Sequence, residues 1–308
     1  MRPIRLCLPA TSANLGPGFD AVGLAIGLWL TIDAEVRAED GGAPLTIEAT
    51  GRNADRCART ANNMIFETYR DVLGQAGKDV PPLHLRIANE IPLAMGCGSS
   101  AAALLAGVML ANHFGGLGWD TQACLEEACR REGHPDNVAA CVLGYMTVSA
   151  VSEGSVVSAT CGYGLGWKLF LALPEVSLAT ERARAMLPGE YSRADAVANV
   201  QRTALLVAAF ALGRGDLLRV AMQDRLHQPY RMAACPLLQR LLPLAGEGGV
   251  LGVALSGAGP GVLVVAAADA AADEIAARIH GAAGDPGLEI VETRVCSGAS
   301  QEVSGEGA

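Results

Sequence analysis

The chain has 308 residues, of which 51% are hydrophobic and 4% aromatic, and its mean hydropathy is +0.29. This length suits two domains, and the composition provides a large core that Ala, Leu, Val and Gly must pack. The net charge of −9 and the pI near 5.1 argue against nucleic acids and anionic membranes as main partners, because both attract basic surfaces.

The sequence predicts a cytoplasmic protein that does not cross a membrane. Its longest apolar runs, 101–111 and 204–213, are far shorter than the ~18 residues that span a bilayer. Asn14, Pro17 and Asp20 interrupt any export signal near the N-terminus. The nine cysteines form no C-x-x-C pair, so we interpret them as buried small side chains rather than metal ligands or disulfides.

Taken in chain order, the apolar periodicity predicts an α+β fold. We expect strands at 4–8, 22–37, 45–50, 83–89, 144–151, 167–173, 250–255, 261–267 and 288–295. We expect helices at 62–75, 100–113, 120–132, 192–212, 215–227 and 270–281. Ser192 and Asp195 have the spacing of a helix N-cap, and Pro229 should end the helix before it. The tail after Cys296 should be frayed, and a boundary near 160 would separate domains 1–160 and 161–308.

The segment 91–102, I-P-L-A-M-G-C-G-S-S-A-A, predicts a site for a nucleotide phosphate. Gly96 and Gly98 let the backbone turn its N–H groups inward, and two serine hydroxyls follow. The apolar run from Ala101 then begins a buried helix, whose N-terminus favours an anion. The segment contains no lysine, and Ala101 stands where a dinucleotide fingerprint needs a third glycine. A glycine turn for close packing is the alternative interpretation.

Two polar turns are candidates for a substrate cleft. Residues 9–20 form a loop that presents the amide of Asn14 and the carboxylate of Asp20, unless it is an ordinary Asx or Ser turn. Residues 132–137, E-G-H-P-D-N, place three hydrogen-bonding side chains within four positions, although a lone turn histidine is often structural. Glu126, two turns earlier on the same predicted helix, faces either this cleft or solvent.

Two arginines are candidates to clamp a carboxylate, because a guanidinium fork binds it bidentately and lysine does not. Arg202 follows Asn199 on one predicted helical face, and Arg231 ends the polar stretch 224–231. Surface salt bridges are the alternative. The Gly-rich segment 255–261 permits close backbone approach, or else makes a plain hairpin.

In this order, the segments resemble the GHMP kinases over nearly the whole chain. Segment 91–102 is similar to that superfamily's central phosphate motif, and 255–261 to its C-terminal Gly-rich motif. Residues 9–20, 133–137 and 227–231 resemble, more narrowly, the homoserine kinases. The resemblance implies a two-domain α+β fold with a ribosomal S5 domain 2-like N-terminal half and a ferredoxin-like C-terminal half.

The resemblance also implies ATP-dependent phosphorylation of the side-chain hydroxyl of L-homoserine to O-phospho-L-homoserine, in threonine biosynthesis. It implies Mg²⁺ held by Ser100 and Glu126, and a homodimer. The implied substrate contacts are Asn14, Asp20, His134, Asn137, Arg202 and Arg231, of which Asp20 and Asn137 are the implied catalytic residues. The implied ATP contacts are Asn62, Pro92, Leu93, Ala94, Met95, Gly96, Cys97, Gly98, Ser99, Ser100, Ala101 and Ala102.

Catalysis without a general base is our hypothesis, because the motifs offer no lysine beside Asp20. The rival functions are a GHMP kinase for another small alcohol and a non-catalytic metabolite-binding regulator on the same scaffold.

Overall fold

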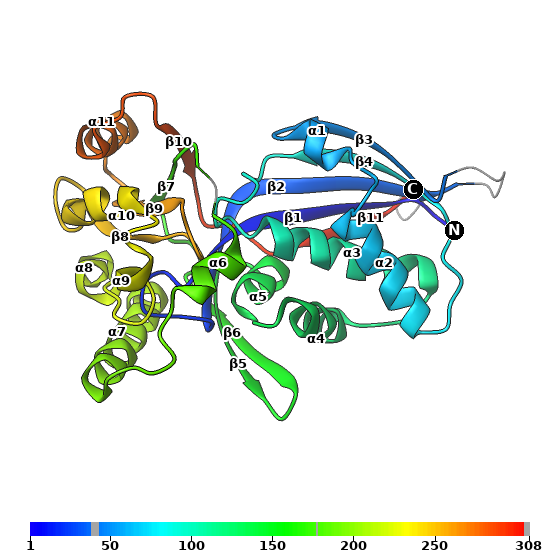
Figure 1. Cartoon of the computed structure of the whole chain (residues 1–308), viewed down its shortest axis with the longest axis horizontal. Coiled ribbons are helices and arrows are strands. Elements are labelled where there is room, and N and C mark those ends of the chain that lie inside the picture. Colours follow the sequence, from blue (N-terminus) through cyan, green and yellow to red (C-terminus); the bar gives the residue numbers. More distant parts are fainter. Residues whose placement is uncertain (38–42, 177, 305–308) are drawn as a thin grey trace.

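Residues 1–37, 43–176 and 178–304 are described by a computed structural model, in which two halves are each built on one β-sheet (Figure 1). The first sheet has the strand order β11-β1-β2-β4-β3, and the β5–β6 hairpin is attached to β2. Among the described strands of this sheet, only β3 and β4 pair in parallel. Its strands are β1 (Ile4–Ala13), β2 (Val22–Val36), β3 (Leu45–Gly51), β4 (Leu83–Asn89), β5 (Met146–Ser152), β6 (Ser155–Cys161) and β11 (Ser300–Val303).

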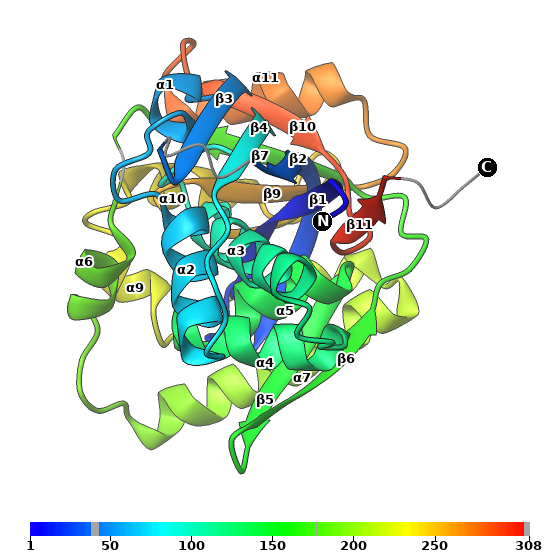
Figure 2. The same cartoon turned by 90° about the vertical axis from the view of Figure 1, so that its right-hand side faces the viewer.

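Helices α2 to α5 lie together on one side of the first sheet (Figure 2). Helix α3 is apolar on most sides because it packs against the sheet and between other helices. Gly107 permits its close contact with α2, since a Cβ there would lie 2.6 Å from Ile65 O. Asn63 caps α2 by accepting from Phe66 N at 3.1 Å. The helices of this half are α1 (Ala54–Cys57), α2 (Met64–Gln75), α3 (Ser99–Gly115), α4 (Thr121–Glu132) and α5 (Asp136–Leu143).

The second sheet is antiparallel, with the order β10-β7-β9-β8. Its strands and longer helices follow one another as β-α-β-β-α-β, which is the ferredoxin-like pattern and confirms that expectation. Its strands are β7 (Lys168–Leu173), β8 (Val250–Leu255), β9 (Val262–Ala266) and β10 (Glu289–Thr293). Its helices are α6 (Thr180–Ala185), α7 (Arg193–Leu212), η1 (Gly215–Leu217), α8 (Leu218–Ala221), α9 (Gln228–Arg231), α10 (Pro236–Leu241), η2 (Leu242–Leu244) and α11 (Ala272–Ala283).

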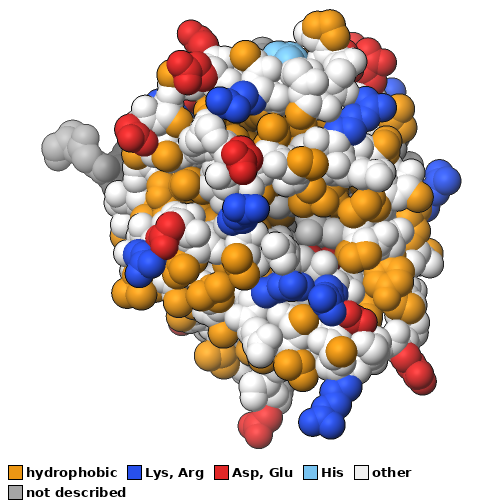
Figure 3. Space-filling model, turned by 90° about the vertical axis from the view of Figure 1, so that its left-hand side faces the viewer, with side chains coloured by type: hydrophobic (Ala, Val, Ile, Leu, Met, Phe, Trp, Pro, Cys, Tyr) orange, Lys and Arg blue, Asp and Glu red, His pale blue; other side chains and the backbone are white. Residues whose placement is uncertain are grey.

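Helix α7 begins as predicted, with Ser192 Oγ accepting from Asp195 N at 3.1 Å. Among the described residues, α7 alone has the length and hydropathy to cross a membrane. A single helix of this kind is weak evidence for a membrane span. Its Asn199 and Thr203 side chains donate to Pro17 O at 3.2 and 2.8 Å, so α7 packs against the first half. On the face of this half shown in Figure 3, acidic, basic and apolar side chains are intermixed.

The predicted helix at 215–227 is wrong beyond Ala221. The chain turns there because the buried Asp224 carboxylate accepts from the backbone N–H groups of residues 226–228, at 2.6–2.9 Å. Pro229 then lies in the first turn of α9 instead of ending a helix, which is where proline costs no hydrogen bond. The pattern also did not predict α5 or β6.

The tail is not frayed throughout, because β11 pairs with β1 in antiparallel register. Ser304 N donates to Pro3 O at 3.0 Å, so the end of the described chain lies beside its beginning. We retain the division into 1–160 and 161–308 as a proposal, since β6 ends at Cys161 and β7 begins at Lys168. On that division, β11 would belong by sequence to the second domain and by pairing to the first sheet.

Candidate active site

The predicted anion site is a turn at the N-terminus of α3 whose backbone donors are free. Gly96 and Gly98 have φ of +77° and +67°, and Gly98 is the N-cap of α3. Within the described residues, the N–H groups of residues 96–98 have no hydrogen-bond acceptor. Such a row of donors at a helix N-terminus is suited to phosphate. The carbonyls of residues 95–97 are held from outside the loop, at 2.8–3.3 Å, by Gly261 N, Ser256 Oγ and Thr11 N.

Gly96→Ala is expected to destabilise the protein, because the new Cβ would lie 1.9 Å from Ser256 O at a left-handed φ. Backbone strain of this kind costs roughly 1–3 kcal/mol before the clash is counted. We expect a fall in Tm of about 4 °C or more in a thermal melt. Gly116→Ala is the matched control: Gly116 has φ +58° with nothing within 4 Å, so only the strain applies. Equal shifts in Tm would contradict the clash.

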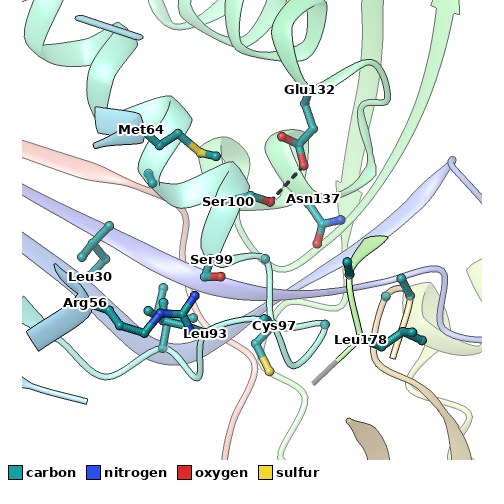
Figure 4. A pocket seen from close by; sticks show the side chains of 18 of the residues that line it. Leu30, Arg56, Met64, Leu93, Cys97, Ser99, Ser100, Glu132, Asn137 and Leu178 are labelled. Atoms are coloured by element: carbon teal, nitrogen blue, oxygen red, sulfur yellow. Dashed lines mark hydrogen bonds between the residues drawn. The ribbon is translucent and has the colours of Figure 1, made fainter. Parts of the chain in front are cut away.

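A cavity of about 560 Å³ extends from this turn between the two halves (Figure 4). The predicted site residues that line it are Asn14, Asp20, Asn62, Leu93, Ala94, Gly96, Cys97, Gly98, Ser99, Ser100, His134, Asn137 and Arg231. The predicted residues that do not line it are Pro92, Met95, Ala101, Ala102, Glu126 and Arg202. Most of the predicted phosphate and substrate segments therefore share one cavity.

The carboxylate beside the loop serines is Glu132, not Glu126. Ser100 Oγ donates to Glu132 Oε1 at 3.2 Å, and Figure 4 shows the two side chains pointing toward each other. Glu126 instead accepts from Gln122 Nε2 at 2.9 Å, one turn away on α4, and lies outside the cavity. Burial raises the pKa of the Glu132 carboxyl. Assigning Glu126 to the metal is thus not supported, because the helix carries it away from Ser100.

The charged end of the cavity contains an ion pair that the sequence did not predict. Arg184, from α6, donates from both terminal nitrogens to Asp20, at 2.6 and 3.1 Å. The hydrogen bond to Asp20 raises the pKa of Arg184. His134 Nδ1 lies 2.6 Å from Asp136 Oδ1. Burial disfavours the charged His134 ring, but Asp136 outweighs it and raises the pKa. A cation, two carboxylates and an imidazole therefore meet in one place.

Only one of the two predicted clamp arginines reaches this end. Arg231 is buried and lines the cavity. Arg202 lies outside the cavity and donates to Gln223 Oε1 at 3.1 Å on the exposed side of α7. Arg184 takes its place: Arg184 Cζ and Arg231 Cζ lie 5.5 and 5.6 Å from the centre of the Phe19 ring. Helix α6 therefore brings Arg184, rather than the predicted Arg202, beside Arg231 and Asp20.

Two asparagines fix the loops around the charged end. Asn14 Nδ2 donates to Gly257 O at 3.0 Å, and its Oδ1 accepts from Asp20 N at 3.1 Å. Asn137 Oδ1 accepts from Thr11 Oγ1 at 2.7 Å. The opposite end of the cavity, beyond the phosphate turn, is lined by Asn62 and by four residues that no sequence motif indicated: Arg56, Arg59, Asn63 and Met64.

Glu132 and Arg184, which were not predicted as site residues, differ in how much local sequence signal they carry. Glu132 opens the polar segment 132–137, so its sequence position already carried a signal. Arg184 lies in A-T-E-R-A-R-A-M with no glycine, proline or polar cluster beside it. No local pattern distinguishes it from Arg182.

The phosphate turn, the adjoining oxygen pair and the charged pocket together define a phosphotransferase site for a small molecule. Family models agree: the N-terminal domain of the GHMP kinases matches residues 63–145, and their C-terminal domain matches residues 206–285. The chain is therefore a GHMP kinase, with the fold that the resemblance implied.

Full-length relatives narrow the family. The chain is 48% identical to the homoserine kinase of Solibacter usitatus over 260 residues, 84% of each chain. It is 39% identical to the homoserine kinase of Synechocystis over 282 residues, 92% of each chain. The crystal structure of homoserine kinase from Cytophaga hutchinsonii has the same fold, with a TM-score of 0.82, 24% identity and 98% of both chains covered. The chain belongs to the homoserine kinase family.

Proposed function

We propose that the protein transfers the terminal phosphoryl group of ATP to the side-chain hydroxyl of L-homoserine. The observation that carries this proposal is the Arg184–Asp20 ion pair at the end of the cavity that holds the phosphate turn. An α-amino acid is a zwitterion, so its two charged groups can replace the single Arg184–Asp20 ion pair by two ion pairs between substrate and protein. Its ammonium would bind Asp20, and its carboxylate would bind Arg184 and Arg231. A neutral sugar or polyol has no charged groups to pair with Asp20 and the two arginines.

The phosphate end supplies the other half of the reaction. The free N–H groups of residues 96–98 and the N-terminus of α3 would bind the phosphates of ATP. Ser100 Oγ and Glu132 Oε1 present two oxygen donors 3.2 Å apart, the ligand type that Mg²⁺ prefers, so they would hold the ion that accompanies ATP. A bound Mg²⁺ would neutralise charge on the phosphate oxygens.

The remaining groups of the pocket position the acceptor hydroxyl. Asn137 and His134 line the same cavity as the phosphate turn and Asp20. His134 is already bonded to Asp136, and Asp20 to Arg184. We therefore retain the hypothesis that the hydroxyl proton leaves to the phosphate or to water, with the protein supplying alignment and charge.

Asp20→Asn tests that assignment. Loss of the charge should raise KM for homoserine by about 30-fold, since a hydrogen bond to a charged group contributes ~1.5–3 kcal/mol. The kcat should fall much less, because Asp20 binds the ammonium and takes no proton. Steady-state kinetics with each substrate varied will separate the two. A large loss of kcat with unchanged homoserine KM would make Asp20 the base.

The proposed reaction itself is tested by ADP release with ATP and Mg²⁺ and one of four acceptors: homoserine, mevalonate, galactose or shikimate. We expect turnover with homoserine alone. Turnover with another alcohol would make the protein a different GHMP kinase, and binding of ATP without turnover would make it a regulator. A place in threonine biosynthesis follows from the product. The cytoplasmic location and the homodimer stay predictions.

A further inference from the structure

Arg231 is held from behind by groups that do not belong to the cavity lining. Its side chain is only 1% exposed, although it lines the cavity. Arg231 Nε donates to Ala183 O at 3.2 Å, and Nη1 lies 3.0 Å from His227 Nδ1. Within the described residues Nη2 makes no hydrogen bond. Two of its three nitrogens are thus fixed, and the third is left for a ligand.

The hydrogen bonds of His227 determine its tautomer. A guanidinium has no acceptor, so Nδ1 must accept from Arg231 and carries no proton. The other nitrogen, Nε2, lies 2.8 Å from Gly16 O, a carbonyl that can only accept, so Nε2 carries the proton. A doubly protonated ring would set an N–H against the guanidinium in a fully buried place. His227 therefore has to be the neutral Nε2–H form.

Burial points the same way, since it lowers the pKa of His227. The charged groups that face the ring are Asp224, 3.6 Å from Nε2, and Arg231, with Asp20 farther away. Asp224 is already saturated by Asn199 Nδ2 at 2.9 Å and by three backbone N–H groups. It fixes the turn that carries His227, while the ring contacts Gly16 and Arg231.

These contacts close a ring of interactions around the charged end. His227 joins Gly16 to Arg231, and Arg231 joins His227 to Ala183. Arg184, next in sequence, pairs with Asp20, which is on the same loop as Gly16. Gly16 itself is pressed against the 222–228 turn, since a Cβ there would lie 2.1 Å from Met222 O.

We propose that His227 is a positioning residue: its neutral ring links the Asn14–Asp20 loop to Arg231 and aims the free nitrogen of Arg231 at the substrate carboxylate. This inference rests on the proposed function. His227 does not line the cavity, so it acts only through Arg231 and the loop. Phe19, stacked on the imidazole with 5.4 Å between ring centres, separates it from the cavity.

Two substitutions of His227 separate its two hydrogen bonds, one to Gly16 O and one from Arg231. In His227→Gln the amide nitrogen reaches the position of Nε2, which keeps the donor to Gly16 O but loses the acceptor for Arg231. In His227→Asn the amide oxygen stands near Nδ1, which keeps that acceptor. We expect His227→Gln to raise KM for homoserine at least tenfold, with KM for ATP and kcat within twofold. His227→Asn, which keeps the acceptor for Arg231 and loses the donor to Gly16 O, should raise KM for homoserine less than His227→Gln does.

A double-substitution cycle then tests whether the effect passes through Arg231. In the Arg231→Ala background, His227→Gln should change kcat/KM for homoserine by less than twofold. A merely structural histidine would instead lower Tm, impair both KM values, and add its effect to that of Arg231→Ala; these results would overturn the proposal.

The wild-type protein gives a measurement that needs no variant. Long-range ¹H–¹⁵N NMR at neutral pH should show His227 with a protonated Nε2 and an unprotonated Nδ1. A protonated Nδ1 or a doubly protonated ring would overturn the proposal even if His227→Gln does not fold. If wild-type protein shows no homoserine turnover, the proposed function fails. If it turns homoserine over and His227→Gln has normal KM, only the positioning role fails.

Discussion

Glu132→Gln is expected to lower kcat/KM for ATP by about 100-fold, whereas Glu126→Gln should change it less than twofold. Glu132 is the carboxylate that Ser100 Oγ reaches, at 3.2 Å, beside the N-terminus of α3. Glu126 is bonded to Gln122 on the same helix and lies outside the cavity. A loss of 100-fold corresponds to about 2.7 kcal/mol of transition-state stabilisation, similar to the cost of removing one preorganised electrostatic contact from an active site.

The substitution is nearly isosteric, so its effect reports charge more than shape. The Mg²⁺ concentration that gives half-maximal rate should rise in Glu132→Gln and stay constant in Glu126→Gln, and KM for homoserine should change little in either variant. Titrating Mg²⁺ at saturating homoserine measures this directly. If the variant at position 126 instead required more Mg²⁺, the sequence-based assignment would be right and the geometric one wrong.

The contrast between these two glutamates shows what sequence alone can and cannot assign. The phosphate turn was predictable because its function depends on backbone geometry, and Gly96 and Gly98 encode that geometry locally. Choosing a partner for Ser100 required the pitch and end of α4. Both glutamates are on that helix, and only its last residue, Glu132, faces the turn.

Most elements of the second half were also predictable from local sequence, but the prediction of a helix at 215–227 was wrong beyond Ala221. Strands β7 to β10 and helices α7 and α11 are each visible as apolar segments of the sequence, with Ser192 marking the start of α7, and their order gives the topology. The 215–227 segment has helical composition, yet the buried Asp224 carboxylate competes for its backbone N–H groups and turns the chain. Those bonds are local, but an aspartate inside an apolar periodic segment does not by itself indicate them. Asn199, from α7, also donates to this carboxylate at 2.9 Å, and sequence periodicity gives no sign of that contact.

Arg184→Ala is expected to raise KM for homoserine by about 100-fold, with KM for ATP and kcat nearly unchanged. The substitution removes one proposed ligand of the substrate carboxylate and leaves Asp20 without its partner. Truncating one member of a hydrogen-bonded charge pair costs ~2–5 kcal/mol of binding. Arg184→Lys should recover only part of the loss, because an ammonium lacks the fork that contacts both Asp20 oxygens.

Arg202→Ala is the matched control, since Arg202 contacts Gln223 outside the cavity, and its homoserine KM should stay within twofold of wild type.

The thermal stability of Arg184→Ala is a second control. The Arg184 and Asp20 side chains are 36% and 34% exposed, and pairs this exposed contribute ~0–1 kcal/mol to folding. Arg184→Ala should therefore melt within a few degrees of wild type. A large fall in Tm would make Arg184 a structural tie between α6 and the Asn14–Asp20 loop. A large effect of Arg202→Ala on homoserine KM would return the carboxylate clamp to α7.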